Sequence, residues 1–272
     1  MTDTTQQKKA NKKIKVIIAI VAAIVILAGA GTGAWFYFAG QNTSAAAASE
    51  EADPDVAQED YETMQAEVVT DSDDPLLRKI DFEALQEVNP DVYAWIWIPG
   101  TNIDYPVLQS ATKEVDYYLN TTIDGKQGYP GAIYTQKYNS TSFADPVTVM
   151  YGHNMKNGTM FTALHKYADK TFFDENPYLY IYHPDYTLKY QIFSATSFDD
   201  RYILGEYNFQ DPIDFQRYLD ELRSSIDGNV NSEVQVAQDT TILTLSTCIT
   251  EYPDQRWLVN ATIIDGVAEV DQ

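Results

Sequence analysis

The sequence of 272 residues is poor in the side chains that most often carry site chemistry. It has one cysteine, Cys248, and three histidines. A single cysteine excludes an internal disulfide, and one thiol with three scattered histidines gives no ligand spacing for a metal site. A glycine-rich loop that could hold phosphate groups is also missing. Metal and nucleotide chemistry are therefore not expected.

Basic residues are scarce as well. Eighteen Lys and Arg stand against 40 Asp and Glu, and the formal net charge is −22. Nucleic-acid binding needs a cationic surface, so this balance argues against a nucleic-acid partner. The hydrophobic content of 44% is ample for a packed core, and 20 tyrosines and 11 phenylalanines favour a sheet-rich fold.

Charge is absent from one long stretch near the N-terminus. Five lysines within residues 1–15 precede an uncharged run at 16–39. As a helix, this run would be about 36 Å long, enough to cross a hydrocarbon core of about 30 Å. The lysines indicate a cytoplasmic N-terminus. We therefore expect a single-pass cell-membrane protein whose remaining residues are extracellular, and a cleaved signal peptide is the alternative.

The segment 40–75 is acidic and rich in Ala and Gln. Between residues 50 and 74 it holds 11 acids and neither Lys nor Arg. Such a composition is typical of a solvated, self-repelling spacer, so we expect an extracytoplasmic linker whose end near the domain could be helical. The remaining residues, 76–272, then form one extracytoplasmic domain.

Short stretches within residues 76–272 have the aromatic and β-branched composition of strands, with turn signals between them. They are 92–98, 103–109, 131–135, 146–152, 178–182, 187–198, 241–247 and 256–264. This pattern is typical of an antiparallel barrel or sandwich. Helices are expected at 81–90, 159–169 and 211–227. The last should begin with Asp211 as its N-cap and Pro212 in its first turn.

Cys248 follows the expected strand 241–247. If the strand continues to its end, Thr244, Ser246 and Cys248 share one face, because side chains alternate along a strand. If the next strand pairs with it as a hairpin, Cys248 and Arg256 meet on this less apolar face. A slip of one residue in register would separate them. A buried, inert cysteine is the alternative.

His153 is the best candidate for an acid–base partner of Cys248. It ends the strand 146–152 and opens a polar loop, where a rigid scaffold commonly carries catalytic groups. His165 is expected on the surface, and His183 in a turn. A nearby imidazolium or arginine favours the reactive thiolate. Cys248, His153 and Arg256 would then supply a nucleophile, an acid–base group and a charge that stabilises an oxyanion.

The sequence around these residues resembles that of class B sortases. The resemblance runs from about residue 76 to 265, and the His and Cys segments appear in the family's order. The matching segments are NPDVYAWIWIPGTNIDYPVLQ (89–109), VDYYLN (115–120), YGHNMKNGTMF (151–161) and TLSTC (244–248) with Arg256 eight residues later.

The resemblance implies a mainly β fold. Its core would be a closed β-barrel of about eight strands with N-terminal helices, and a long helix would precede the strand that leads to Cys248. It also implies a cysteine transpeptidase in a Gram-positive organism. Cys248 would attack the carbonyl of a threonine in the C-terminal sorting signal of a surface protein. His153 would protonate the leaving amine, and Arg256 would contact the substrate.

An amine would then release the thioacyl intermediate. The resemblance gives a lipid-linked peptidoglycan precursor or a pilin lysine as its source, and it implies neither a metal nor an organic cofactor. Residues next to the three catalytic candidates are expected to bind substrate, and they are Tyr151, Asn154, Ser246 and Thr247. Ile249 and Thr250 stand where some members of the family carry an acid, so no catalytic acid is assigned.

Two other functions fit parts of the pattern. An exported cysteine protease would share the thiol chemistry but use water as the acceptor, and a non-enzymatic surface scaffold would need no thiol. An L,D-transpeptidase is disfavoured, because the close His and Cys spacing of its motif is missing. Both LPxTG-like and NPxTN-like sorting signals stay open, because loop shape decides between them.

Overall fold

The structure is a computed structural model that describes residues 52–224, 227–237 and 240–268. The chain divides into two compact units, 1–48 and 49–272, and every described residue belongs to the second. The predicted basic tail at 1–15 and the predicted membrane segment at 16–39 lie outside the described residues. Within the described ranges, no helix combines the length and apolar character that a membrane crossing needs. The described residues therefore do not support the predicted single-pass membrane location, and it is not retained.

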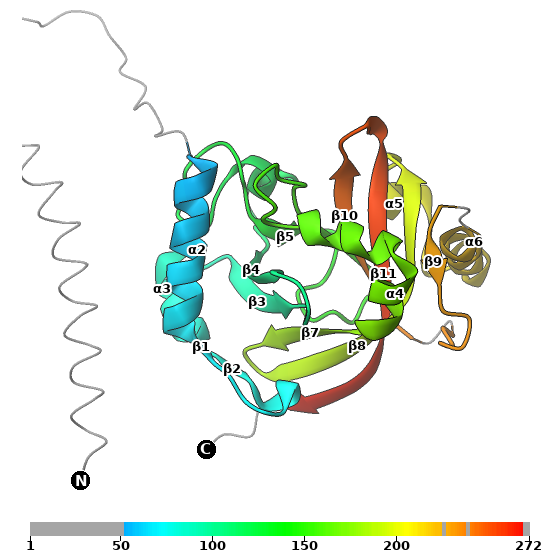
Figure 1. The fold of residues 1–272 in the computed structure, drawn as a ribbon, viewed down its shortest axis with the longest axis horizontal. Helices are drawn as coiled ribbons and strands as arrows, with labels where there is room; N and C mark the ends of the chain where they lie inside the picture. Colours follow the sequence, from blue (N-terminus) through cyan, green and yellow to red (C-terminus); the bar gives the residue numbers. More distant parts are fainter. Residues whose placement is uncertain (1–51, 225–226, 238–239, 269–272) are drawn as a thin grey trace, which may run out of the picture. The chain divides into compact units, whose positions relative to one another are not determined.

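Eight strands close into a β-barrel (Figure 1), which confirms the predicted fold class. Around the barrel the order is β11-β10-β6-β5-β4-β3-β7-β8, and β8 pairs with β11 to complete the ring. Closure leaves these strands no free edge. The strands are β3 (Val92–Trp97), β4 (Asp104–Leu108), β5 (Ile133–Thr135), β6 (Val147–Tyr151), β7 (Tyr178–His183), β8 (Tyr186–Asp199), β10 (Ile242–Ile249) and β11 (Tyr252–Ala268).

The predicted antiparallel pairing is wrong for two pairs of strands. β4 runs parallel to β5, and β6 runs parallel to β10. A parallel pair needs a crossover connection of a dozen or more residues, and the chain from β6 to β10 is long enough to provide one. Because of this crossover, the C-terminal ends of β6 and β10 lie at the same end of the barrel.

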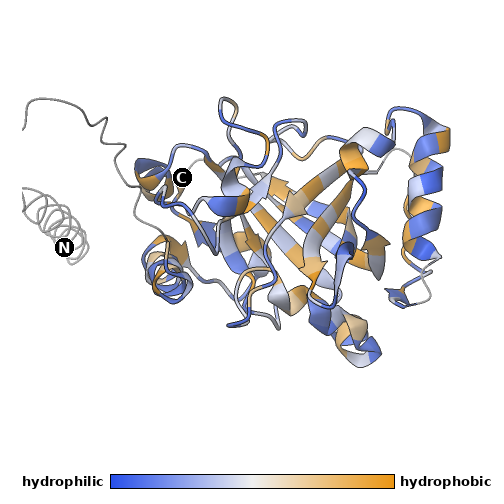
Figure 2. Ribbon diagram, turned by 90° about the horizontal axis from the view of Figure 1, so that it is seen from above, coloured by the Kyte–Doolittle hydropathy of each residue, from blue (hydrophilic) through white to orange (hydrophobic). Residues whose placement is uncertain are grey.

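Apolar side chains alternate between the two faces of the barrel wall. Figure 2 shows hydrophobic residues concentrated along the strands. On β10, Leu243 and Leu245 belong to the interior core, whereas Ile242 belongs to a second cluster outside the wall. The outer face of β10 is therefore the one that also carries Thr244, Ser246 and Cys248.

The second apolar cluster lies under helix α6 (Pro212–Arg223), which Figure 1 shows outside the barrel. The Asp211 side chain accepts a hydrogen bond from Ile213 N at 2.8 Å, which confirms the predicted N-cap. The buried face of α6 packs against the wall, and Tyr218 and Thr244 share a hydrogen bond of 2.8 Å between their hydroxyl groups. The helix is shorter than predicted, because Ser224 already caps its C-terminus.

An additional helix, α2 (Pro54–Val68), lies within the predicted linker at 40–75. Asp53 caps its first turn, and it buries Ala57, Tyr61 and Val68. The Tyr61 hydroxyl donates to Gly131 O at 3.2 Å, which ties the helix to the barrel. The spacing of four and seven residues between these buried positions gives α2 one apolar face, which its acidic composition conceals.

Short elements complete the structure. The predicted helix at 81–90 is α3 (Phe82–Val88). The predicted helix at 159–169 is instead the 3-10 helix η3 (Thr162–Ala168), followed by α4 (Lys170–Glu175). The break comes at Asp169, whose side chain accepts from Phe172 N at 2.8 Å and starts the new helix. These elements are β1 (Val69–Thr70), η1 (Pro75–Leu77), β2 (Lys79–Ile80), α3 (Phe82–Val88), η2 (Tyr117–Asn120), η3 (Thr162–Ala168), α4 (Lys170–Glu175), α5 (Ile203–Glu206) and β9 (Asn229–Val230).

Candidate active site

The thiol lies at the end of the hairpin formed by β10 and β11. Cys248 is exposed and stands directly opposite Arg256 in the antiparallel register, which is the pairing that side-chain alternation predicts. Immediately after Cys248 the register shifts, since Ile249 pairs with Tyr252. Residues 253–255 are therefore a bulge on β11 beside the thiol. Bulges commonly occur next to active sites, where they redirect side chains.

Arg256 is held by this bulge. Its Nη1 donates to Pro253 O at 3.0 Å and to Gln255 O at 2.8 Å. Both acceptors are backbone carbonyls of the bulge itself, so the guanidinium position depends on the shape of the backbone beside Cys248. The arginine supplies a fixed positive charge on the strand that faces the thiol.

His153 reaches the same end of the barrel from β6. Tyr151 lies beside Ser246 in the parallel register, and Gly152 N donates to Ser246 O at 3.2 Å. Neighbouring strands are about 4.8 Å apart. His153 and Cys248 each lie two residues beyond this pair, His153 just after β6 and Cys248 near the end of β10. The structure thus places His153, Cys248 and Arg256 at the neighbouring ends of three adjacent strands.

Gly152 is needed for the close packing at the end of β6. A Cβ atom at this position would lie 2.5 Å from Ile133 Cδ1 and 2.7 Å from Phe161 Cγ. Real Cβ contacts are not this short, so any other residue would push the backbone away from β5. His153 follows directly and would move with it.

The imidazole of His153 is oriented by the backbone of η2. Its Nε2 donates to Leu119 O at 2.7 Å, and its ring lies 4.7 Å from the ring of Tyr129. With Nε2 protonated, the neutral ring carries its lone pair on Nδ1. Burial lowers the pKa of His153, and the Leu119 hydrogen bond opposes this shift. The ring is therefore neutral at neutral pH, as a base must be.

The predicted substrate-binding residues do not all lie on one face. Tyr151 is half-buried and stacks on Tyr134 with a centroid distance of 5.4 Å. Ser246 is buried on the outer face, the same face as Cys248. Thr247 points to the opposite face, is 2% exposed, and its Oγ1 has no hydrogen-bond partner within the described structure. Thr247 therefore reaches the outer face only through its backbone.

Asn154 contacts the thiol segment directly. Its Nδ2 donates to Cys248 O at 3.1 Å and to Thr250 Oγ1 at 3.2 Å. The loop that follows His153 is thereby joined to the end of β10. The same segment thus carries the acid–base candidate and a contact to the nucleophile's backbone.

His165 is a site residue that sequence reasoning missed. The prediction placed it on the surface, but its Nε2 donates to Cys248 O at 3.0 Å. Its ring also packs against that of Trp257, with centroids 5.9 Å apart. The error follows from the helix type, because a 3-10 helix orients successive side chains differently from the α-helix expected at 159–169. No local sequence signal marks this contact, which joins segments far apart in the chain.

A second feature that the sequence did not predict is a group of tyrosines around Tyr151, namely Tyr134, Tyr138 and Tyr202. Tyr134 donates from its hydroxyl to Asp116 Oδ1 at 3.1 Å, and Gln136 Nε2 donates to the same oxygen at 2.6 Å. Burial raises the pKa of Tyr134 and Asp116 raises it further, so this tyrosine stays a neutral donor. Tyr138 and Tyr202 are exposed, with ring centroids 6.3 Å apart.

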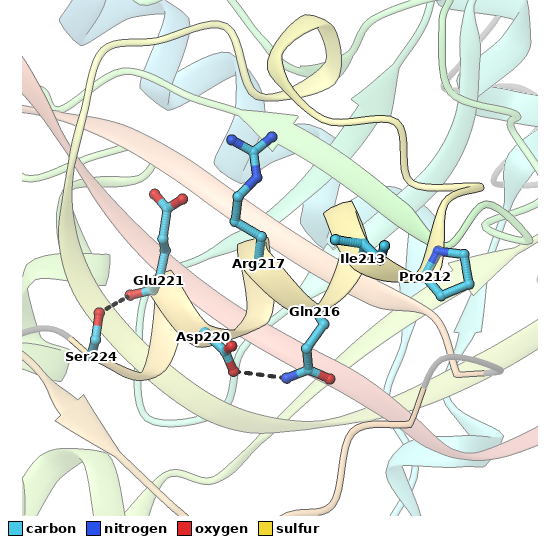
Figure 3. A pocket seen from close by; sticks show the side chains of 7 residues that line it. All are labelled: Pro212, Ile213, Gln216, Arg217, Asp220, Glu221 and Ser224. Carbon is cyan, nitrogen blue, oxygen red and sulfur yellow. Dashed lines mark hydrogen bonds between the residues drawn. The ribbon is translucent and has the colours of Figure 1, made fainter.

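Two hollows of the described surface lie away from the thiol. One, of about 640 Å³, is bordered by seven residues of α6 and its C-cap, which Figure 3 shows along a single helix. The other, of about 250 Å³, lies between α2 and residues 122–126. Residues of one helix face do not enclose a ligand, so we do not place the active site there. In the described part of the chain, no cluster of His, Cys, Asp and Glu could hold a metal ion.

Comparisons with known proteins agree with this geometry. The sortase domain family matches residues 96–264. Sortase B of Listeria monocytogenes serovar 1/2a is 37% identical over 185 residues, which cover 66% of this chain and 72% of that protein. Sortase B of Staphylococcus aureus is 34% identical over 188 residues, with 67% and 74% covered. The X-ray structure of Clostridium perfringens Sortase B is 30% identical, with a TM-score of 0.61 and coverage of 68% and 100%.

The barrel, the thiol at its strand end and these matches define a cysteine transpeptidase of the sortase type. The chain belongs to the sortase family. Within that family its relatives and structural neighbours are class B, and so is this chain. The resemblance drawn from the His and Cys segments is thereby confirmed.

Proposed function

We propose that the protein cleaves a C-terminal sorting signal after its threonine and joins the threonine carbonyl to an amine. His153 first accepts the thiol proton of Cys248 on Nδ1. The resulting thiolate attacks the carbonyl carbon, the peptide C–N bond breaks, and a thioester forms on sulfur. The leaving amine takes its proton from His153. An incoming amine then attacks the thioester, gives a proton back to His153, and leaves an amide bond and a free thiolate.

One observation carries this proposal. Cys248 lies near the C-terminal end of β10, His153 follows the C-terminal end of the parallel neighbour β6, and Arg256 stands opposite Cys248 on β11. Because His153 donates through Nε2 to Leu119 O, we assign the transferred proton to Nδ1. Arg256 is assigned to the oxyanion, where one well-placed donor contributes about 10²–10³ in rate.

Solved relatives support the two substrate classes. A Staphylococcus aureus Sortase B structure is a substrate complex, and another Sortase B structure is complexed with triglycine. They are 28% and 32% identical to this chain, with TM-scores of 0.62 and 0.60. By analogy we propose a protein sorting signal as the donor. The acceptor would be a primary amine, as in a peptidoglycan precursor or a pilin lysine. Tyr151, Ser246 and the Thr247 backbone are proposed to contact the bound peptide, and a peptide contact of Asn154 would appear as an effect of its substitution on KM.

The proposal is tested with the full chain, a set of LPxTG-like and NPxTN-like peptides, and triglycine as the acceptor. We expect one peptide to be cleaved after threonine and to yield an amide product whose share rises with triglycine concentration. The variant Cys248→Ala should give neither product. Hydrolysis with no amide product at any triglycine concentration would favour the cysteine protease. Cleavage by Cys248→Ala would remove the thiol from the reaction altogether.

A further inference from the structure

The backbone pairing of β10 stops just before the nucleophile. The last hydrogen bond between β6 and β10 joins Gly152 N to Ser246 O at 3.2 Å, and β6 ends at Tyr151. In a strand the carbonyl groups of alternate residues point the same way, so Cys248 O points toward the side where β6 has ended. If β6 continued, the backbone N–H of Asn154 would be the next donor in line.

Two side chains supply the missing donor. Asn154 Nδ2 lies 3.1 Å from Cys248 O, and His165 Nε2 lies 3.0 Å from the same oxygen. The two nitrogens are 3.2 Å apart, so they approach the carbonyl together. The end of β6 leaves this carbonyl without a backbone partner, and it accepts instead from two side chains of different segments.

His165 is itself held in place. Its ring packs on Trp257 at an interplanar angle of 26°. Trp257 is buried, and its Nε1 donates to Leu164 O at 2.9 Å. Leu164 precedes His165 on η3, so the indole fixes both the backbone and the ring of the donor. The nitrogen that meets Cys248 O is therefore supported by β11, the strand that also carries Arg256.

We propose that Asn154 and His165 are positioning residues for the transpeptidase reaction, and that they hold the backbone of Cys248 so that its sulfur stays aligned with His153. The inference rests on the proposed function of Cys248 as the nucleophile. Asn154 directly follows His153, so its bond to Cys248 O links the acid–base group to the nucleophile. Neither side chain has to touch the substrate.

This role predicts a change in turnover without a change in substrate binding. Alignment of the reacting groups acts on the chemical step, and an error of about 1 Å can reduce the rate about 10²-fold. A residue that binds the peptide equally in its ground and transition states would instead change KM and leave kcat unchanged. The split between kcat and KM separates this role for Asn154 from a contact with the peptide.

The test uses the full chain, triglycine and the sorting-signal peptide that the wild-type protein cleaves. His165→Phe keeps a ring for Trp257 but has no N–H, whereas His165→Gln keeps a donor. Asn154→Leu removes the amide at similar volume. Each donor-free single variant should lower kcat about fivefold, because one donor still holds the carbonyl. The double variant should lower it about 10²-fold at an unchanged KM, and His165→Gln should recover most of the loss from His165→Phe.

The matched control is His183→Phe, which replaces a histidine that stacks on Tyr186 at the turn between β7 and β8. It should leave kcat and KM at their original values. Wild-type kcat in the folded double variant would overturn the inference, and so would a loss confined to KM. Folding is checked by the unfolding midpoint of each variant. Cys248→Ala separates the proposed function from the proposed positioning role, because activity in that variant would refute the assignment of Cys248 as the nucleophile.

Discussion

Two polar clusters of the barrel differ in burial: one holds a buried, paired charge, and the other surrounds an exposed thiol residue. Near η1, the Arg78 side chain is 4% exposed and donates to Asp71 at 2.9 Å and to both carboxylate oxygens of Asp104 at 2.8 and 2.6 Å. Trp95 Nε1 and Gln65 Nε2 also donate to Asp104. At the thiol end, the sulfur is exposed, and the hydrogen bonds there hold Arg256, His153 and the Cys248 backbone.

The comparison separates stability from reactivity. The cluster around Arg78 buries a charge and surrounds it with partners, so it joins the segment after α2 to β3 and β4. The thiol site fixes its backbone and its imidazole with carbonyl and amide groups but leaves the reacting atom exposed to solvent. We therefore expect variants of the first cluster to change the free energy of unfolding and variants of the second to change catalysis.

The largest effect on stability is expected from Asp104→Asn. The substitution removes the charge that faces buried Arg78, and breaking one partner of a buried pair costs about 3–5 kcal/mol. Urea unfolding monitored by tryptophan fluorescence measures the loss. The double variant Arg78→Met with Asp104→Leu should recover part of it, because no unpaired charge then stays buried. A loss under about 1 kcal/mol, the size of an exposed pair, would contradict this account of the cluster.

Gly152→Ala should affect both stability and catalysis. The new Cβ overlaps Ile133 and Phe161, and overpacking of this kind costs about 1–3 kcal/mol. Since His153 follows directly, kcat for transpeptidation should fall as well. Gly158→Ala is the control on the same loop. A Cβ added at Gly158 would have no atom within 4 Å, but the residue has a φ of +84°. We therefore expect Gly158→Ala to lower the free energy of unfolding through backbone strain and to leave activity unchanged. Equal kcat in the two variants would show that the fit at Gly152 does not position His153.

A smaller effect should appear as a pH dependence of stability. Burial lowers the pKa of both His153 and His183, and neighbouring groups oppose the shift. Below the unfolded pKa of about 6.5, the unfolded chain therefore binds more protons than the folded chain. Stability should be full above that pH and fall as the pH drops through it. Urea titrations between about pH 7.5 and 5.5 measure the slope, which His183→Gln should reduce. Stability that rises toward low pH would reverse the sign of these shifts.

The smallest effect on stability is expected from Cys248→Ala. The side chain is exposed, and substitutions at such positions usually change stability by less than about 0.5 kcal/mol. The same variant should lose all transpeptidation. A large loss of stability together with the loss of activity would mean that the thiol belongs to the packed core and would remove the contrast between the two clusters.

Much of the fold could be predicted because it depends on local patterns. Each predicted strand overlaps an observed strand, and the alternation along 241–247 and 256–264 led to the observed pairing of Cys248 with Arg256. The N-cap at Asp211 also follows from a local rule. Such features need only the residues of one segment or of two consecutive segments.

The remaining features depend on contacts between distant segments. The parallel pairing of β6 with β10 joins strands separated by all the elements from η3 to β9, and periodicity does not encode it. The contact of His165 with Cys248 O requires the same crossover and a 3-10 helix where an α-helix was expected. The sequence left helix α2 undecided, because its acidic composition outweighed three apolar positions. The domain boundaries and the roles of the site residues stay predictions.

The most direct test of the central claim is intact-protein mass spectrometry of the full chain after exposure to a sorting-signal peptide without an added amine. We predict one adduct with the mass of the acyl fragment that ends in threonine. It should lie on the peptide that contains Cys248, disappear on addition of triglycine, and be absent from Cys248→Ala. An adduct on any other residue, or cleavage of the peptide by Cys248→Ala, would contradict the account.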